Sequence, residues 1–155
     1  MKRILFFFLF GCIAFSCEKE YYTTIPNYDV HLQLDLANSD IILKNTQYAY
    51  KTFTQPRIYS DRLLSRGILV INGQGESPLV NLHAFDLACP NEAPKNIHVK
   101  PDNTSAVPTA NTATCPECGA VYIILDGSGK PQSGSKYYLK PYRVSGSGTQ
   151  FTVHN

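Results

Sequence analysis

Apolar and polar side chains alternate strictly over residues 30–36, where Val30 and every second residue after it are apolar. A period of two places successive side chains on opposite faces of a strand, so this segment predicts a half-buried β-strand. Further apolar or β-type segments predict strands at 41–43, 48–53, 67–71, 79–85, 120–125, 137–144 and 150–153. Because no stretch has the length and 3.6-residue period of a long helix, the pattern predicts an all-β fold.

Turn and loop signals separate these segments. Asn72-Gly73 is a tight-turn signal at the end of the strand predicted over 67–71. Residues 126–129 predict a turn between two strands, and residues 101–114, rich in Pro, Thr, Asn and Ala, predict a loop. Residues 57–66 are compatible with one short helical turn. We find no internal repeat, so one domain is expected.

Composition narrows the functional classes. The chain has 155 residues, of which 43% are hydrophobic, and a formal net charge of +2. A chain of this length and composition buries a core and is not disordered. Nucleic-acid binding needs a basic face, so this near-neutral charge predicts no nucleic-acid partner. The five cysteines are an odd number, which leaves at least one thiol unpaired or otherwise employed.

The N-terminal residues have the pattern of a secretory signal. Lys2 and Arg3 precede an apolar run over 4–15, and the charged residues 18–20 follow Cys17 directly. Small residues before a cysteine and charge after it resemble a bacterial lipoprotein signal. In that family the cysteine thiol receives a diacylglycerol and becomes the new N-terminus. The residues after Cys17 also resemble the surface-export signals of Bacteroidetes lipoproteins.

This resemblance implies a signal peptide over 1–16, a lipid-anchored tether over 17–27 and a folded domain over 28–155. The membrane is then a partner through the lipid on Cys17, and the location is the cell envelope, at the outer membrane on its periplasmic or surface-facing side. Cys12, which follows Leu-Phe-Gly, is a rival lipidation position, and an ordinary cleaved signal is a second alternative.

Three cysteines remain in the folded domain, in two short motifs. The first motif is Cys89-Pro90-Asn91, and the second is Cys115-Pro116-Glu117-Cys118-Gly119, which leads into a predicted strand. A Leu-x-x-Tyr segment, Leu139 to Tyr142, follows further along. In this order the motifs resemble a Rieske-type iron–sulfur domain over residues 67–155. That family implies a small antiparallel β sandwich or barrel with a two-loop metal-site subdomain, a 2Fe-2S cluster, one-electron transfer and a redox protein as partner.

The ligand positions depart from the family pattern. Rieske loops supply two thiolates to one iron and two imidazoles to the other. Cys89 and Cys115 stand at the thiolate positions, whereas Asn91 and Cys118 stand where histidines are expected. A carboxamide offers a neutral, hard oxygen and is a poor ligand for a soft iron–sulfide centre. His98, or else His83, is a candidate for the missing ligand.

Three hypotheses therefore remain open from the sequence. The first is a 2Fe-2S cluster with altered ligation, used in electron transfer. The second is a zinc site formed by the three cysteines and one histidine. The third is a domain without metal, with a Cys115–Cys118 disulfide or free thiols, acting as a non-enzymatic binding module at the surface or in the periplasm. Aromatic residues such as Tyr21, Tyr22, Tyr137 and Tyr138 would then be its contact residues. No catalytic triad or pair of acids predicts a stand-alone enzyme.

Overall fold

The computed structural model describes residues 22–63, 66–75, 80–93, 95–103 and 105–155. The predicted signal peptide, Cys12, Cys17 and Tyr21 lie outside the described residues. Within them, no helix is both long and apolar enough to cross a membrane.

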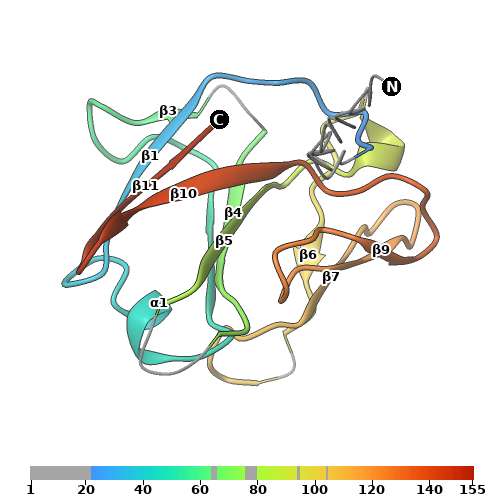
Figure 1. Cartoon of the computed structure of the whole chain (residues 1–155). Helices are drawn as coiled ribbons and strands as arrows, with labels where there is room; N and C mark the ends of the chain where they lie inside the picture. The colour runs from blue at the N-terminus through green and yellow to red at the C-terminus, as the bar shows by residue number, and fades with distance from the viewer. Residues whose placement is uncertain (1–21, 64–65, 76–79, 94, 104) are drawn as a thin grey trace, which may run out of the picture.

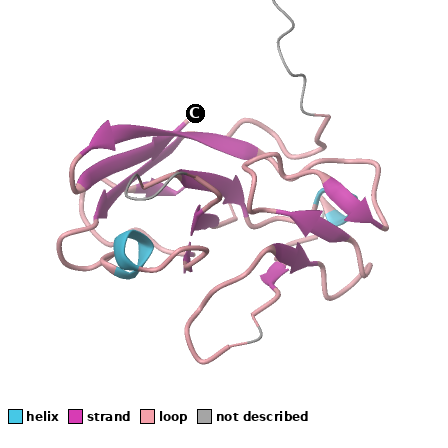
Figure 2. Cartoon of the chain, turned by 60° about the horizontal axis from the view of Figure 1, so that its bottom comes forward, coloured by secondary structure: helices cyan, strands magenta, loops and turns pink. Residues whose placement is uncertain are grey.

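The described chain is an all-β fold of two antiparallel sheets, which confirms the predicted fold class (Figure 1). The large sheet has the strand order β2-β4-β5-β10-β11-β1-β3, and the small sheet has the order β6-β7-β8-β9. Figure 2 shows the strands in these two groups, with α1 beside the large sheet. The large sheet contains β1 (Val30–Asp35), β2 (Tyr50–Phe53), β3 (Arg62–Leu63), β4 (Ile68–Asn72), β5 (Leu82–Asp86), β10 (Pro141–Ser147) and β11 (Gln150–His154). The small sheet contains β6 (Lys100–Pro101), β7 (Thr112–Thr114), β8 (Val121–Ile123) and β9 (Pro131–Ser133).

Two hydrophobic clusters lie on opposite faces of the central strands. Every residue of β4 is buried, because Ile68 and Val70 belong to one cluster while Leu69 and Ile71 belong to the other. Burial on both faces explains why this strand is a continuous apolar run rather than an alternating one. β1 contributes its alternate leucines to a single cluster, as its period of two predicts. The cluster that contains Leu69 and Ile71 joins the large sheet to the small one, and it includes Cys89 and Cys115.

The structure corrects four local predictions. Residues 41–43 form no strand, because backbone hydrogen bonds from Leu43 to Asp40 and from Asn45 to Ile41 close the short helix α1 (Ile42–Asn45). Residues 57–63 contain no helix, since the Asp61 carboxylate accepts the backbone N–H groups of Arg57 and Ile58. The predicted loop over 101–114 includes β7 and the end of β6, and the strand predicted over 120–125 is confined to β8.

His83 on β5 packs between two glycines. A Cβ atom added to Gly73 would lie 2.3 Å from Cδ2 of His83, and one added to Gly127 would lie 2.4 Å from its Nδ1. Within the described chain, Nε2 of His83 is buried and has no hydrogen-bond partner. Burial lowers the pKa of His83 below the usual histidine value, against the opposing charge of Asp126. The folded protein therefore disfavours the charged imidazole.

This burial predicts a loss of stability in mild acid. The unfolded chain takes up the His83 proton near the ordinary histidine pKa of about 6.5, whereas the folded chain takes it up only at lower pH. The free energy of unfolding should therefore fall as the pH drops from about 6.5. Denaturant unfolding between neutral and mildly acidic pH measures this dependence. His83→Gln should flatten it and the control His31→Gln should retain it; an unchanged pH profile in His83→Gln would contradict the assignment.

Candidate metal centre

The three cysteines of the folded domain meet at one end of the small sheet. Cys89 follows β5 and directly precedes a 3₁₀ turn (Pro90–Glu92), whereas Cys115 and Cys118 lie between β7 and β8. Their Sγ atoms all lie within 4.8 Å of one another, and those of Cys89 and Cys118 are 3.7 Å apart. Cys89 and Cys115 are buried, whereas Cys118 is exposed. Three thiols so close together could hold a metal ion.

Main-chain hydrogen bonds fix both cysteine loops. In the first loop, the Cys89 N–H donates to the Ile97 carbonyl over 2.9 Å, and an isolated bridge pairs Ala88 with His98. In the second, the Cys115 N–H donates to Ala120 over 2.9 Å and the Gly119 N–H donates to Cys115 over 3.0 Å. Gly119 has a φ of +70°, a left-handed conformation that glycine adopts without strain. This backbone conformation explains why the second cysteine motif ends in a glycine.

A buried carboxylate accepts a backbone hydrogen bond from the first cysteine loop. Asp86, at the end of β5, is 0% exposed. Its Oδ1 accepts the Ala88 N–H over 2.7 Å and its Oδ2 accepts the Tyr142 hydroxyl over 2.8 Å. Burial raises the pKa of Asp86, and these two donors act against that rise. The tyrosine of the Leu-x-x-Tyr segment thus acts on the Cys89 loop through Asp86.

Two polar side chains contact the sulfur atoms. The Tyr122 hydroxyl lies 3.6 Å from Sγ of Cys89, and Nδ2 of Asn91 lies 3.5 Å from Sγ of Cys118. The Asn91 amide orientation is fixed, because Nδ2 also donates to the Gly134 carbonyl over 2.9 Å and Ser135 Oγ donates to its Oδ1 over 2.8 Å. A carbonyl only accepts, so the nitrogen must face Gly134 and Cys118. Asn91 offers the centre a hydrogen-bond donor rather than an oxygen ligand.

The thiols differ in acidity because their surroundings differ. Burial raises the pKa of Cys89 to about 12. Partial burial also acts against ionisation of Cys118, but the Ala120 N–H and the Asn91 amide outweigh it and lower its pKa. Burial likewise raises the pKa of the Tyr122 hydroxyl. A metal ion bound here has to displace the Cys89 proton, so its affinity should weaken as the pH falls.

The histidines proposed as a fourth ligand lie elsewhere. Among the His, Cys, Asp and Glu side chains of the described residues, only those of the three cysteines bring their ligand atoms together at this centre. Nε2 of His98 lies 3.2 Å from Oδ1 of Asn96, and an isolated β-bridge pairs His98 with Ala88. His83 packs against Gly73 and Gly127. Cys115 and Cys118 are both free thiols in the structure, without the disulfide of the third hypothesis.

Sequence reasoning missed three residues that shape the centre. Tyr122, Ser135 and Gly134 reach it from β8 and from the segment after β9. The only signal in the sequence is the position of Tyr122, four residues after Cys118 and three after Gly119. Ser135 and Gly134 carry no motif.

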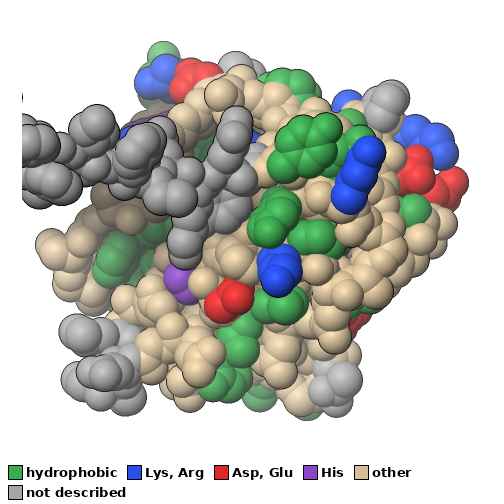
Figure 3. All heavy atoms as spheres, turned by 45° about the vertical axis from the view of Figure 1, so that its right-hand side comes forward, with side chains coloured by type: hydrophobic (Ala, Val, Ile, Leu, Met, Phe, Trp, Pro, Cys, Tyr) green, Lys and Arg blue, Asp and Glu red, His purple; other side chains and the backbone are tan. Residues whose placement is uncertain are grey.

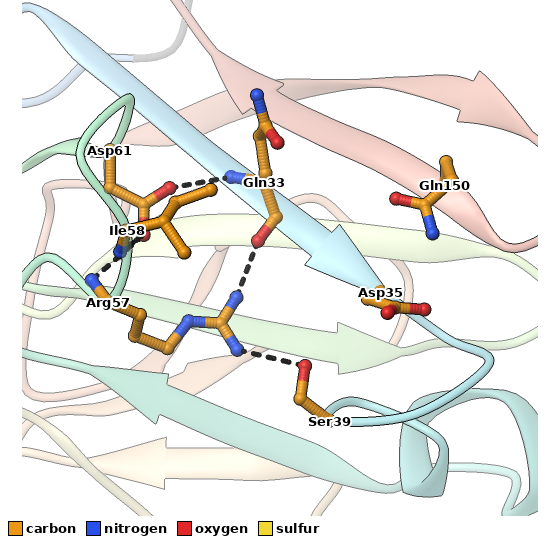
Figure 4. A pocket seen from close by; sticks show the side chains of 7 residues that line it. All are labelled: Gln33, Asp35, Ser39, Arg57, Ile58, Asp61 and Gln150. Atoms are coloured by element: carbon orange, nitrogen blue, oxygen red, sulfur yellow. Dashed lines mark hydrogen bonds between the residues drawn. The ribbon is translucent and has the colours of Figure 1, made fainter.

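A hollow away from the cysteines lies between β1, β11 and the loop before β3 (Figure 4). Its polar groups already serve the fold. Asp61 accepts the backbone N–H groups of Gln33 and Arg57 over 3.1 and 2.9 Å. The Arg57 guanidinium donates to the Gln33 carbonyl and to the buried carboxylate of Asp40. These bonds fasten the loop to β1, so we assign the hollow a structural role.

Comparison with known proteins identifies no family for this chain. No protein-family model matches the sequence, and a search of curated proteins found no significant match. Its function has to be argued from the cysteine centre itself.

Proposed function

We propose that this chain is an exported lipoprotein whose Rieske-like domain binds one zinc ion through the thiolates of Cys89, Cys115 and Cys118. The observation that carries this proposal is the 3.7 Å separation between the sulfur atoms of Cys89 and Cys118. Two thiolates on one tetrahedral zinc ion, each about 2.3 Å from the metal, lie about 3.8 Å apart. The two sulfur atoms are therefore spaced as ligands of one ion.

The ion would have a mainly structural role. It would join the loop after β5 to the loop between β7 and β8, so its binding energy would stabilise the junction of the two sheets. Cys118 is exposed whereas the other two cysteines are buried, and the fourth coordination position would therefore face solvent, where water can fill it. The Asn91 amide would donate a hydrogen bond to the Cys118 thiolate and hold it in place. An open fourth position is by itself typical of catalytic zinc, so our proposal of a binding module rests on the ion joining the two loops at the junction of the sheets.

A 2Fe-2S cluster with electron transfer is the second candidate. The Tyr122 hydroxyl beside Sγ of Cys89 favours it, because hydrogen bonds to cluster sulfurs tune reduction potentials. The donor set does not fit this cofactor well. In the Rieske pattern Cys89 and Cys118 would bind different irons, yet their sulfur atoms lie as close as ligands of one ion. The oxygen of Asn91, at the remaining ligand position, accepts a hydrogen bond from Ser135.

Metal analysis of the unlipidated domain separates the candidates. Residues 18–155 should be produced under low oxygen, and zinc, iron, sulfide and free thiols measured per chain. We expect one zinc, no sulfide and no visible absorption band. Two irons and two sulfides per chain would establish the cluster instead. A metal-free protein with a mass lower by two hydrogens would establish the disulfide.

A further inference from the structure

The chain just before β1 packs against the metal centre instead of forming a free tether. The Tyr138 N–H donates to the Tyr22 carbonyl over 2.8 Å, and the Thr24 hydroxyl donates to the Pro90 carbonyl over 2.5 Å. Ile25 is only 5% exposed. Pro90 follows Cys89 directly, so these contacts attach the segment to the first cysteine loop.

An aromatic patch lies where this segment meets the centre. We define it as Tyr22, Lys136 and Tyr137. The rings of Tyr22 and Tyr137 have centroids 5.2 Å apart, and Nζ of Lys136 lies 5.1 Å from the centroid of the Tyr137 ring. Tyr22 is 61% exposed. Figure 3, which brings the side of the small sheet forward, shows hydrophobic side chains on this face with both basic and acidic side chains among them.

Hydrogen bonds connect the patch to the centre. The Tyr137 N–H donates to Ser135 Oγ over 2.9 Å, and Ser135 donates to Oδ1 of Asn91, whose nitrogen lies 3.5 Å from Sγ of Cys118. The patch and the exposed cysteine therefore belong to one end of the molecule. A surface that covers the patch lies next to the metal centre.

We propose that the aromatic patch rests on the lipid bilayer, so that the metal centre is held at the membrane surface. This inference rests on the lipoprotein part of the proposed function. Cys17 and Tyr22 are five residues apart, and five extended residues span at most about 18 Å. A lipid on Cys17 therefore keeps Tyr22 near the bilayer. Tyrosine favours the membrane–water interface, and a lysine beside it is attracted to anionic headgroups.

This orientation would restrict how a partner reaches the proposed zinc ion. With the patch on the bilayer, the exposed side of Cys118 lies close to the headgroups, and the far end of the large sheet points toward water. A partner or ligand of the metal centre then has to reach it at the membrane surface.

Tryptophan fluorescence tests this orientation, because the chain contains no tryptophan of its own. Tyr137→Trp places the probe in the patch. Tyr59→Trp places it on the loop before β3, where Tyr59 is 107% exposed. β3 lies on the opposite side of the molecule from the small sheet (Figure 1). The full-length, lipidated variants are reconstituted into phosphatidylethanolamine–phosphatidylglycerol vesicles with or without brominated acyl chains.

We expect the brominated lipid to remove most of the emission at position 137, with a shift to shorter wavelength, and to leave position 59 unchanged. Tyr22→Trp serves as a second probe of the patch if Tyr137→Trp does not fold. Equal quenching at both positions, or quenching at position 59 alone, would overturn the proposed orientation. Cys17→Ser in the Tyr137→Trp background should lose the quenching.

Two measurements on the same preparations keep this proposal distinct from the metal proposal. Intact mass shows whether Cys17 carries the lipid; an unlipidated wild-type chain would overturn both the lipoprotein assignment and the orientation. Zinc content is measured in parallel. Quenching at position 137 in a chain without zinc would support the docking and count against the zinc centre.

Discussion

Cys118→Ser is expected to weaken zinc binding by more than about 100-fold, since losing an outer-shell partner alone costs about 10–100-fold. Cys118 is exposed, so the substitution removes the proposed ligand without disturbing the buried core. At a free zinc concentration of about 1,000 times Kd, the wild-type domain gains about 4 kcal/mol of stability, and the variant should lose most of this gain. Zinc titration in competition with a chelator, followed by thermal unfolding with and without zinc, measures both effects.

Asn91→Leu is the matched control for this experiment. It removes the amide that donates to Sγ of Cys118 but leaves all three thiols in place. We expect a loss of affinity within the outer-shell range of about 10–100-fold. If Asn91→Leu removed zinc as completely as Cys118→Ser, Asn91 would be a ligand and its assignment as a donor would be wrong. If Cys118→Ser bound zinc as well as the wild type, the three-thiolate site would be refuted.

Asp86→Leu should be the most damaging single change outside the centre. It leaves the Ala88 N–H and the Tyr142 hydroxyl without their carboxylate acceptor in a buried position. The loss of a buried acceptor from two donors should cost about 2–5 kcal/mol of unfolding free energy. Because Ala88 directly precedes Cys89, we also expect weaker zinc binding. Denaturant unfolding of the metal-free protein measures the first effect and zinc titration the second.

Asp86→Asn separates the role of the acceptor from that of the charge. The amide keeps one oxygen for the Ala88 N–H and should retain much of the stability that Asp86→Leu loses. Asp29→Asn, at an exposed ion pair with Arg62, is the surface control and should change stability little. Equal stability in Asp86→Leu and the wild type would show that this carboxylate does not support the loop.

The sequence predicts strands best where burial alone determines the pattern of apolar residues. The alternation over 30–36 and the apolar run over 67–71 correspond to β1 and β4, since burial on one face or on both faces determines each pattern. β9 was not predicted, because Pro131, Gln132 and Ser133 have no β-type pattern and are held by pairing with β8. α1 was predicted as a strand because its apolar residues are too few to distinguish the two periods.

The cysteine centre, too, could be predicted only in part from the sequence. The resemblance of the two cysteine motifs to Rieske loops implied that Cys89, Cys115 and Cys118 belong together, and the structure brings their sulfur atoms within 4.8 Å of one another. The orientation of the Asn91 amide could not be predicted, because its partners Gly134 and Ser135 are 43 and 44 residues away in the sequence. For the same reason, sequence reasoning treated Asn91 as a weak ligand rather than as a donor to Cys118.

X-ray absorption spectroscopy at the zinc edge of the purified domain tests the central claim most directly. We predict three sulfur atoms at about 2.3 Å from the metal and one lighter atom at about 2.0–2.2 Å. The sulfur count should fall to two in Cys118→Ser and remain three in Asn91→Leu. A first shell of nitrogen and oxygen alone, or a protein that contains iron with a second iron close by, would contradict the account.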